Sequence, residues 1–247
     1  MPIRITPAVK VILIACFVMF IVQQTVDQFM GGDILSWLGL IPSEFVINHR
    51  FWQLFTYPFL HGDVMHLFLN LMMLAFIGGE LEATWGTPRF LRYFFFCSTF
   101  AGLLYLFLQL FVWKGAGLHA PMVGASGAIY GLLMAYGLIF GERTLLFMML
   151  FPMKAKHFVW ILAAIEFMSS VFSGRAGLAS AAHLGGMVAG FGFLYIRATL
   201  IVAKRRRAEA AASPKARKKR KSGGHLKLII DNDKAGEDDV ERPKTWH

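Results

Sequence analysis

A serine among small residues begins an apolar stretch near the middle of the chain. It is Ser126, in the run Gly124, Ala125, Ser126, Gly127 and Ala128. Because its neighbours lack large side chains, the serine Oγ is accessible, and a substrate backbone or another helix can come close to it. Such a serine can be the nucleophile of an acyl transfer. The same small residues are also typical of ordinary packing between transmembrane helices, so the run alone leaves both interpretations open.

A histidine lies in a second apolar segment that is rich in glycine. His183 stands three residues before Gly186, and Gly186 and Gly190 form a GxxxG pattern that lets a neighbouring helix approach closely. Residues three apart share roughly one helix face, so His183 should point into that contact and needs a polar partner. A serine hydroxyl is a suitable partner. The alternative is a structural histidine with no part in chemistry.

Two hydrogen-bond donors stand on one face of a third segment. His66 and Asn70 are four residues apart, one helical turn, and His61 lies at the start of the same segment. Two neighbouring donors aimed at one point are what a developing oxyanion requires. They could instead bond the backbone of a neighbouring helix.

Taken together, a nucleophile, a base and two oxyanion donors are the parts needed for acyl transfer. A haem or metal carrier using His61, His66 and His183 is the competing interpretation. The thiolate and carboxylate ligands that usually complete metal sites are missing nearby, and the spacing is not that of the HExxH motif. We therefore expect neither a metal nor another cofactor.

The composition indicates that lipid surrounds the elements that carry these residues. Of the 247 residues, 56% are apolar and only 16% are charged. Apolar runs long enough to cross about 30 Å of hydrocarbon recur along the chain. We predict an all-α membrane protein, a bundle of six transmembrane helices near residues 9–26, 61–79, 89–112, 124–140, 157–173 and 180–202.

Lysine and arginine are distributed as expected for a chain with both termini in the cytoplasm. The first outside loop, about Asp27 to Pro58, is long and carries Trp37 and Trp52, which favours a position in the membrane interface. The stretch Leu145 to Met153 is apolar but too short to span, so we expect it to be a membrane-hugging part of an inside loop. The basic residues assigned to the inside are Arg4, Lys10, Arg89, Arg92, Arg143, Lys154, Lys156 and the C-terminal tail, whereas Arg50, Lys114 and Arg175 fall outside.

The C-terminal part has a different character, which predicts a division into a membrane domain, residues 1–203, and a tail, residues 204–247. The tail begins with ten Lys and Arg between Lys204 and Lys221, which supply most of the net charge of +10, and it ends in an acidic segment. We expect it to be disordered and its basic part to be attracted to anionic lipid headgroups. No aromatic or groove-reading pattern accompanies the charge, so we expect no nucleic-acid partner.

These motifs together resemble the rhomboid protease family. The resemblance rests on His61, His66 and Asn70 in the second segment, on Gly-x-Ser-Gly at Gly124 to Gly127, and on Ala-His-x-x-Gly-x-x-x-Gly at Ala182 to Gly190. Each motif is weak alone, but their order and separation fit the family over about residues 8–200. The resemblance implies a six-helix rhomboid bundle.

The resemblance also implies roles for the residues. Ser126 would attack the scissile carbonyl and His183 would take its proton, in a dyad without a carboxylate. The oxyanion hole would consist of the Ser126 amide with the side chains of His66 and Asn70. Tyr130, one turn after Ser126, would pack against the imidazole. The supporting residues would be His61, Gly124, Gly127, Tyr130, Gly186 and Gly190.

The implied activity is that of a serine endopeptidase that cleaves peptide bonds in or near transmembrane segments. Its partners would be single-span or multi-span membrane protein substrates and the lipids around them. The small build is typical of bacterial members, which suggests a multi-pass protein of the inner membrane. The alternative is a catalytically silent rhomboid-like protein that binds transmembrane segments. Members of that sort lack the serine or the histidine, and this chain has both.

Three positions depart from the pattern or stand outside it. Gln53 follows Trp52 where many members have an arginine, so the usual salt bridge to an acid near Glu82 should be missing. Ala181 stands where some members have glycine. Glu166 is the one carboxylate deep in a predicted transmembrane segment, which makes it a functional candidate, with a hydrogen bond to a neighbouring helix or to the interface as the alternative.

Overall fold

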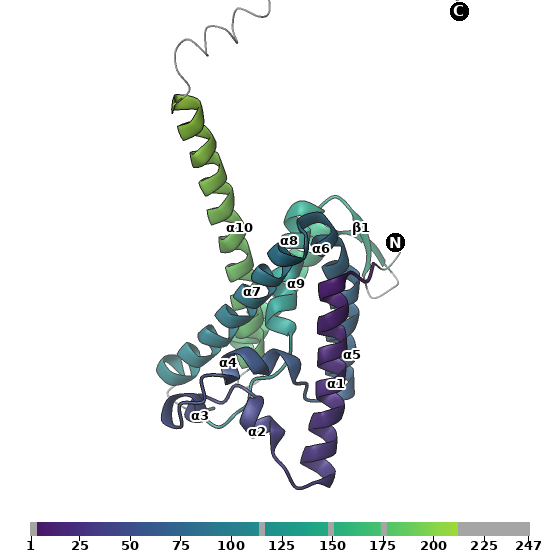
Figure 1. Cartoon of the computed structure of the whole chain (residues 1–247), viewed down its shortest axis with the longest axis vertical. Helices are drawn as coiled ribbons and strands as arrows, with labels where there is room; N and C mark the ends of the chain where they lie inside the picture. Colours follow the sequence, from purple (N-terminus) through teal and green to yellow (C-terminus); the bar gives the residue numbers. More distant parts are fainter. Residues whose placement is uncertain (1–3, 114–116, 148–150, 174–176, 212–247) are drawn as a thin grey trace, which may run out of the picture. The chain divides into compact units, whose positions relative to one another are not determined.

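The computed structural model describes residues 4–113, 117–147, 151–173 and 177–211, and helices dominate it (Figure 1). Among these residues, five helical segments are long and apolar enough to cross a membrane: Pro7–Phe29, Val64–Trp85, Thr87–Val112, Ala155–Phe172 and Ala179–Ala210. A further apolar helix, α8 (Ser126–Ile139), is shorter, with 14 residues. The prediction of an all-α membrane bundle is confirmed. The position of the two termini relative to the membrane stays a prediction.

The chain divides into a compact unit, Met1–Ala198, and a second unit, Thr199–His247. In the second unit, residues 199–210 are exposed helix, part of α10 (Gly177–Ala211). Most of the predicted tail lies outside the described residues. The predicted division at residues 203 and 204, and the disorder of the tail, therefore stay predictions.

Local signals explain where the second span begins and ends. Asp63 is its N-cap, and the Asp63 carboxylate accepts a hydrogen bond of 2.8 Å from the His66 amide. The span ends before Gly86, which has a positive φ of 78° that glycine adopts easily. Pro88 then stands in the first turn of the next helix. The elements of these two spans are α5 (Val64–Met73), the π-helical η2 (Leu74–Gly78), α6 (Gly79–Trp85), α7 (Thr87–Phe107) and the π-helical η3 (Leu108–Val112).

Glu82 fastens the second span to the start of α1 (Pro7–Phe29). Its carboxylate accepts hydrogen bonds of 3.0 Å from the amides of both Ala8 and Val9, and the hydroxyls of Thr6 and Thr87 donate to it as well. The first amides of a helix have no partner within the helix, so the Glu82 carboxylate satisfies two of them. Its negative charge also interacts favourably with the positive end of the helix dipole. Glu82 thus has partners of its own without the arginine that is missing at position 53.

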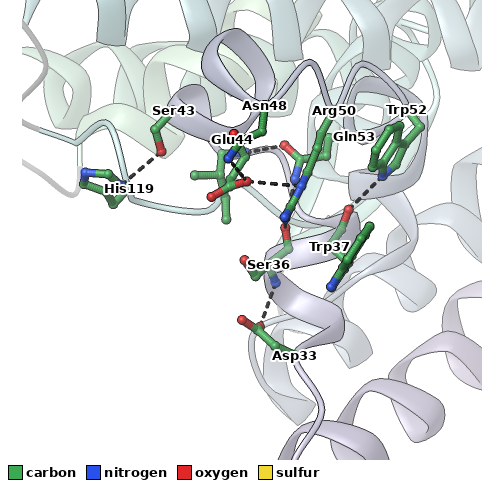
Figure 2. A network of polar contacts seen from close by, with 11 residues as sticks. Asp33, Ser36, Trp37, Ser43, Glu44, Asn48, Arg50, Trp52, Gln53 and His119 are labelled. Atoms are coloured by element: carbon green, nitrogen blue, oxygen red, sulfur yellow. Dashed lines mark hydrogen bonds and ion pairs between the residues drawn. The ribbon is translucent and has the colours of Figure 1, made fainter.

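The loop predicted to lie outside the membrane contains short helices that its own side chains hold together (Figure 2). The amide of Gln53 is fully buried: its Oε1 accepts from the Ile41 amide at 3.1 Å, and its Nε2 donates to the Ser36 carbonyl at 2.9 Å. Gln53 therefore ties separate turns of the loop without a charge. These turns are α2 (Ile34–Leu38), α3 (Pro42–Ile47), α4 (Gln53–Thr56) and the 3₁₀ helix η1 (Tyr57–Phe59).

An arginine elsewhere in this loop supplies its ion pair. Arg50 lies 3.1 Å from the Glu44 carboxylate, and its guanidinium stacks over the Trp37 ring at 4.4 Å (Figure 2). Trp37 also stacks on Trp52, with ring centroids 6.3 Å apart. The exposed indoles fit the predicted interfacial position of the loop, because such rings favour headgroup depth.

The segment after α8 contains two short strands. Strands β1 (Thr144–Phe147) and β2 (Phe151–Lys154) pair there as an antiparallel hairpin, a structure that the sequence did not predict, and the membrane-hugging position of Leu145 to Met153 in an inside loop stays a prediction. Pairing satisfies backbone groups that an apolar environment would leave without partners. The Glu142 carboxylate accepts hydrogen bonds from Lys154 and Lys156, and these bonds lower the pKa of Glu142 to about 2.

Helix α8 lies in the interior of the bundle. Most of its residues are buried, and it packs mainly against α7 and α9 (Ala155–Phe172). Its small residues make this possible: a Cβ on Gly131 would lie 2.5 Å from the Cys97 sulfur. The helix that begins with Ser126 is thus held on several sides, which fixes the serine relative to its neighbours.

Candidate active site

Ser126 and His183 face each other across two helices that are far apart in sequence. Ser126 is the first residue of α8 and is 9% exposed; His183 lies in α10. The serine Oγ and the histidine Nε2 are 2.8 Å apart, which is hydrogen-bond distance. A serine hydroxyl and an imidazole in this geometry can exchange a proton. The structure therefore brings together the two residues predicted as nucleophile and base.

Glycine allows the two helices to come this close. A Cβ on Gly186 would lie 1.9 Å from the Gly127 carbonyl oxygen, and a Cβ on Gly190 would lie 3.0 Å from the Gly131 carbonyl oxygen, both in α8. No larger residue fits without moving the helices apart. The predicted supporting role of Gly127, Gly186 and Gly190 corresponds to this contact between α8 and α10.

Tyr130 holds the imidazole from one side. It lies one turn after Ser126, and its ring stacks on the His183 ring with centroids 4.3 Å apart and planes 9° apart. Because the stacking restricts rotation of the imidazole, it helps to keep Nε2 directed at the serine. This is the arrangement predicted for Tyr130.

The chain just before the serine runs against the two predicted oxyanion donors. Gly124 has a φ of 106°, and a Cβ there would lie 2.7 Å from the His66 ring and 3.3 Å from Asn70 Nδ2. The Asn70 side chain is buried, and its Nδ2 has no hydrogen-bond partner among the described residues. A buried donor without a partner lowers the stability of the fold. When such a donor borders a nucleophile, it can donate a hydrogen bond to a negative charge that forms during the reaction.

His61 lies behind this donor pair. Its ring is fully buried and packs edge to face against the His66 ring, with centroids 5.2 Å apart. The backbone of His61 bonds the Gln23 amide in α1 through its N–H, at 3.3 Å, and its carbonyl, at 3.1 Å. His61 thus packs against His66, and none of the hydrogen bonds found among the described residues joins it to Ser126.

The structure adds Glu166 to the site, a residue for which the sequence left a functional and a structural role open. Oε1 of Glu166, in α9, lies 3.1 Å from Nδ1 of His183, and the Tyr130 hydroxyl donates a hydrogen bond to the same oxygen. The resemblance implies a dyad without a carboxylate, and the structure places the Glu166 carboxylate next to the histidine of that dyad. The one signal for Glu166 in the sequence was its position deep in an apolar segment, where an acid needs a polar partner.

A comparison with known protein families relates the chain to the rhomboid domain. The model of the rhomboid domain matches residues 48–199 of the chain. The matched region contains all the site residues predicted from the sequence, from His61 to Gly190.

Proposed function

Because the chain belongs to the rhomboid family, whose members are generally intramembrane serine proteases, we propose that it is a serine endopeptidase that cleaves membrane proteins with Ser126 as nucleophile. The observation that carries the proposal is the 2.8 Å distance between Ser126 Oγ and His183 Nε2. Acyl transfer needs a nucleophile with an adjacent base. Here the glycines of the two helices let them approach closely enough for the serine to meet the histidine.

The proposed reaction has two halves. In the first, a bond forms between Ser126 Oγ and the scissile carbonyl carbon while the hydroxyl proton passes to His183 Nε2. The carbon–nitrogen bond then breaks, and His183 returns the proton to the leaving amine. In the second half, water attacks the acyl-enzyme, His183 takes one of its protons and gives it to Ser126, and the new carboxyl terminus leaves.

The oxyanion that forms in each half needs donors. The proposed donors are the Ser126 amide at the first turn of α8 and the side chains of His66 and Asn70, which border Gly124. The amides in the first turn of a helix have no partner within the helix, so the Ser126 amide can donate a hydrogen bond to a negatively charged oxygen.

The substrate class follows from where the serine lies. Helix α8 has 14 residues and is about 21 Å long, shorter than about 30 Å of hydrocarbon. A serine at its end would then lie below one surface of the bilayer, in reach of peptide bonds in or near a transmembrane segment. We propose membrane proteins with one or several spans as substrates, with membrane lipids around them.

The chain is a multi-pass integral membrane protein, and we propose the bacterial inner membrane as its location. The ground is the small build and the basic tail, which would contact anionic headgroups on the cytoplasmic side.

Replacing the serine tests the proposal. We expect Ser126→Ala to abolish cleavage of a model single-span substrate in detergent, because no other nucleophile contacts His183 among the described residues. Cut products are measured on gels, and a thermal melt checks that the variant is folded. Ser170→Ala, which removes a hydroxyl that donates to the Phe167 carbonyl of α9 and not to the dyad, is the matched control and should cleave as the parent does.

Two outcomes would count against the proposal. Cleavage by Ser126→Ala at the parental rate would show that another group is the nucleophile. A parent protein that is folded, retains a candidate single-span protein and never cuts it would favour the silent binding protein instead.

A further inference from the structure

A buried carboxylate borders the catalytic imidazole on the side away from the serine. Glu166 is 8% exposed, and Oε1 lies 3.1 Å from His183 Nδ1. Among the described residues, this is the one ion pair that Glu166 makes. An acid placed in an apolar helix is costly unless a partner compensates it, so the position of this partner is informative.

Neighbouring residues hold the carboxylate in place. The Tyr130 hydroxyl donates to Oε1 from α8, and Ser180 supplies a further hydrogen bond from α10. Tyr130 therefore contacts both members of the pair: its ring stacks on His183 and its hydroxyl holds Glu166. A carboxylate with only a structural role would need a hydrogen-bond donor, but that donor would not have to be Tyr130, the residue that also orients His183.

The other titratable groups around His183 do not supply a negative charge. From α5, His66 faces it, with His61 behind His66. From α8 come the hydroxyls of Ser126 and Tyr130. Glu166, from α9, is the carboxylate that reaches the imidazole in the described part of the chain.

The contact still has room to tighten. His183 Nδ1 is buried and makes no hydrogen bond of good geometry in the described part of the chain, although Glu166 Oε1 is at ion-pair distance. Catalytic hydrogen bonds are often poorly aligned before substrate binds and shorten in the reacting complex. A small rotation of the imidazole or the carboxyl group would let Nδ1–H donate to Oε1.

We propose that Glu166 is a positioning residue for His183, so that the site works as a serine, a histidine and a clamped carboxylate. This inference rests on the proposed function. The carboxylate accepts from Nδ1–H, which leaves Nε2 as the acceptor for the serine proton, and it stabilises the imidazolium that forms when that proton arrives. Tyr130 acts through Glu166 by fixing the direction of its carboxyl group.

The first experiment separates charge from shape at position 166. Glu166→Gln keeps the size and a carbonyl oxygen but removes the charge, whereas Glu166→Asp keeps the charge on a shorter side chain. We expect Glu166→Gln to lower kcat about ten- to a hundredfold with KM nearly unchanged, because the lost interaction acts in the transition state. Glu166→Asp should recover part of that loss.

Glu82→Gln is the matched control. Glu82 is also a buried acid, 2% exposed, but it bonds the start of α1 and not the dyad. We expect this variant to melt at a lower temperature than the parent and to keep the parental kcat per folded molecule. If Glu166→Gln behaved like Glu82→Gln, with lower stability and unchanged kcat, Glu166 would be a structural link only and the inference would be wrong.

A double variant tests the role of the tyrosine hydroxyl. Tyr130→Phe keeps the stacked ring and removes the donor to Glu166, so kcat should fall less than in Glu166→Gln. Combined with Glu166→Gln it should cause no further loss, since the hydroxyl acts through the carboxylate. Independent, multiplying losses would contradict that order of action. Ser126→Ala, measured in parallel, distinguishes the two proposals: if it is inactive while Glu166→Gln cleaves as the parent does, only the present inference fails.

Discussion

At the scale of single residues, one predicted oxyanion donor near Ser126, the Asn70 side chain, is held in a state that costs stability. Asn70 Nδ2 is buried and unpaired among the described residues, and an unsatisfied buried donor costs about 1–3 kcal/mol. That cost would be recovered if an oxyanion formed in front of it. The interaction would then be made in the transition state and not in the ground state, which is the condition for raising kcat.

Replacing Asn70 tests this explanation. We expect Asn70→Ala to lower kcat about a hundredfold and to leave KM nearly unchanged, the usual effect of removing one oxyanion donor. Asn70→Ala removes a donor that has no hydrogen-bond partner among the described residues, and this gain offsets the packing lost with the buried side chain, so the melting temperature should stay close to the parental value. Steady-state kinetics and a thermal melt are the measurements. A large fall in stability with kcat preserved would mean that Asn70 has only a packing role.

At the scale of elements, the contact of α8 with α10 sets the distance on which the site depends. The two helices meet where Gly186 faces the Gly127 carbonyl, one turn from His183. Packed helices do not deform gradually, so a side chain added here should move the imidazole away from the serine.

A pair of glycine substitutions in the same helix tests that dependence. A Cβ at Gly186 would lie 1.9 Å from backbone oxygen, whereas a Cβ at Gly192 would have no heavy atom within 4 Å. We expect Gly186→Ala to lose about 1–3 kcal/mol of stability and most of its activity. Gly192→Ala should be neutral or slightly stabilising, because alanine favours the helix. Melting temperatures and cleavage rates compare the two, and equal behaviour would contradict the account.

The elements also show what the sequence could predict. The spans and their motifs followed from apolar length, from the i to i+4 spacing of His66 and Asn70, and from the glycines around His183. The hairpin at β1 and β2 did not follow, because an apolar run that is too short to span has no periodicity of its own. Glu166 was visible as a buried acid, but its partner is on another helix, and spacing within one segment cannot identify such a partner.

At the scale of the whole molecule, the fold is a membrane bundle around a short, buried helix. The long helices expose apolar side chains toward their surroundings, and polar residues gather at the start of α8. A polar site within an apolar shell is where a peptide bond of a membrane-embedded substrate could meet water and a nucleophile. The topology predicted from lysine and arginine would place that site toward the outer face.

The most direct test of the account asks whether Ser126 is activated by His183. The purified full-length protein in detergent is treated with a fluorophosphonate probe, and mass spectrometry of its peptides locates the adduct. We expect the label on Ser126 in the parent and on no residue in Ser126→Ala, with labelling of Ser126 suppressed in His183→Ala. Label on another residue, or labelling of Ser126 that proceeds equally fast without His183, would contradict the account.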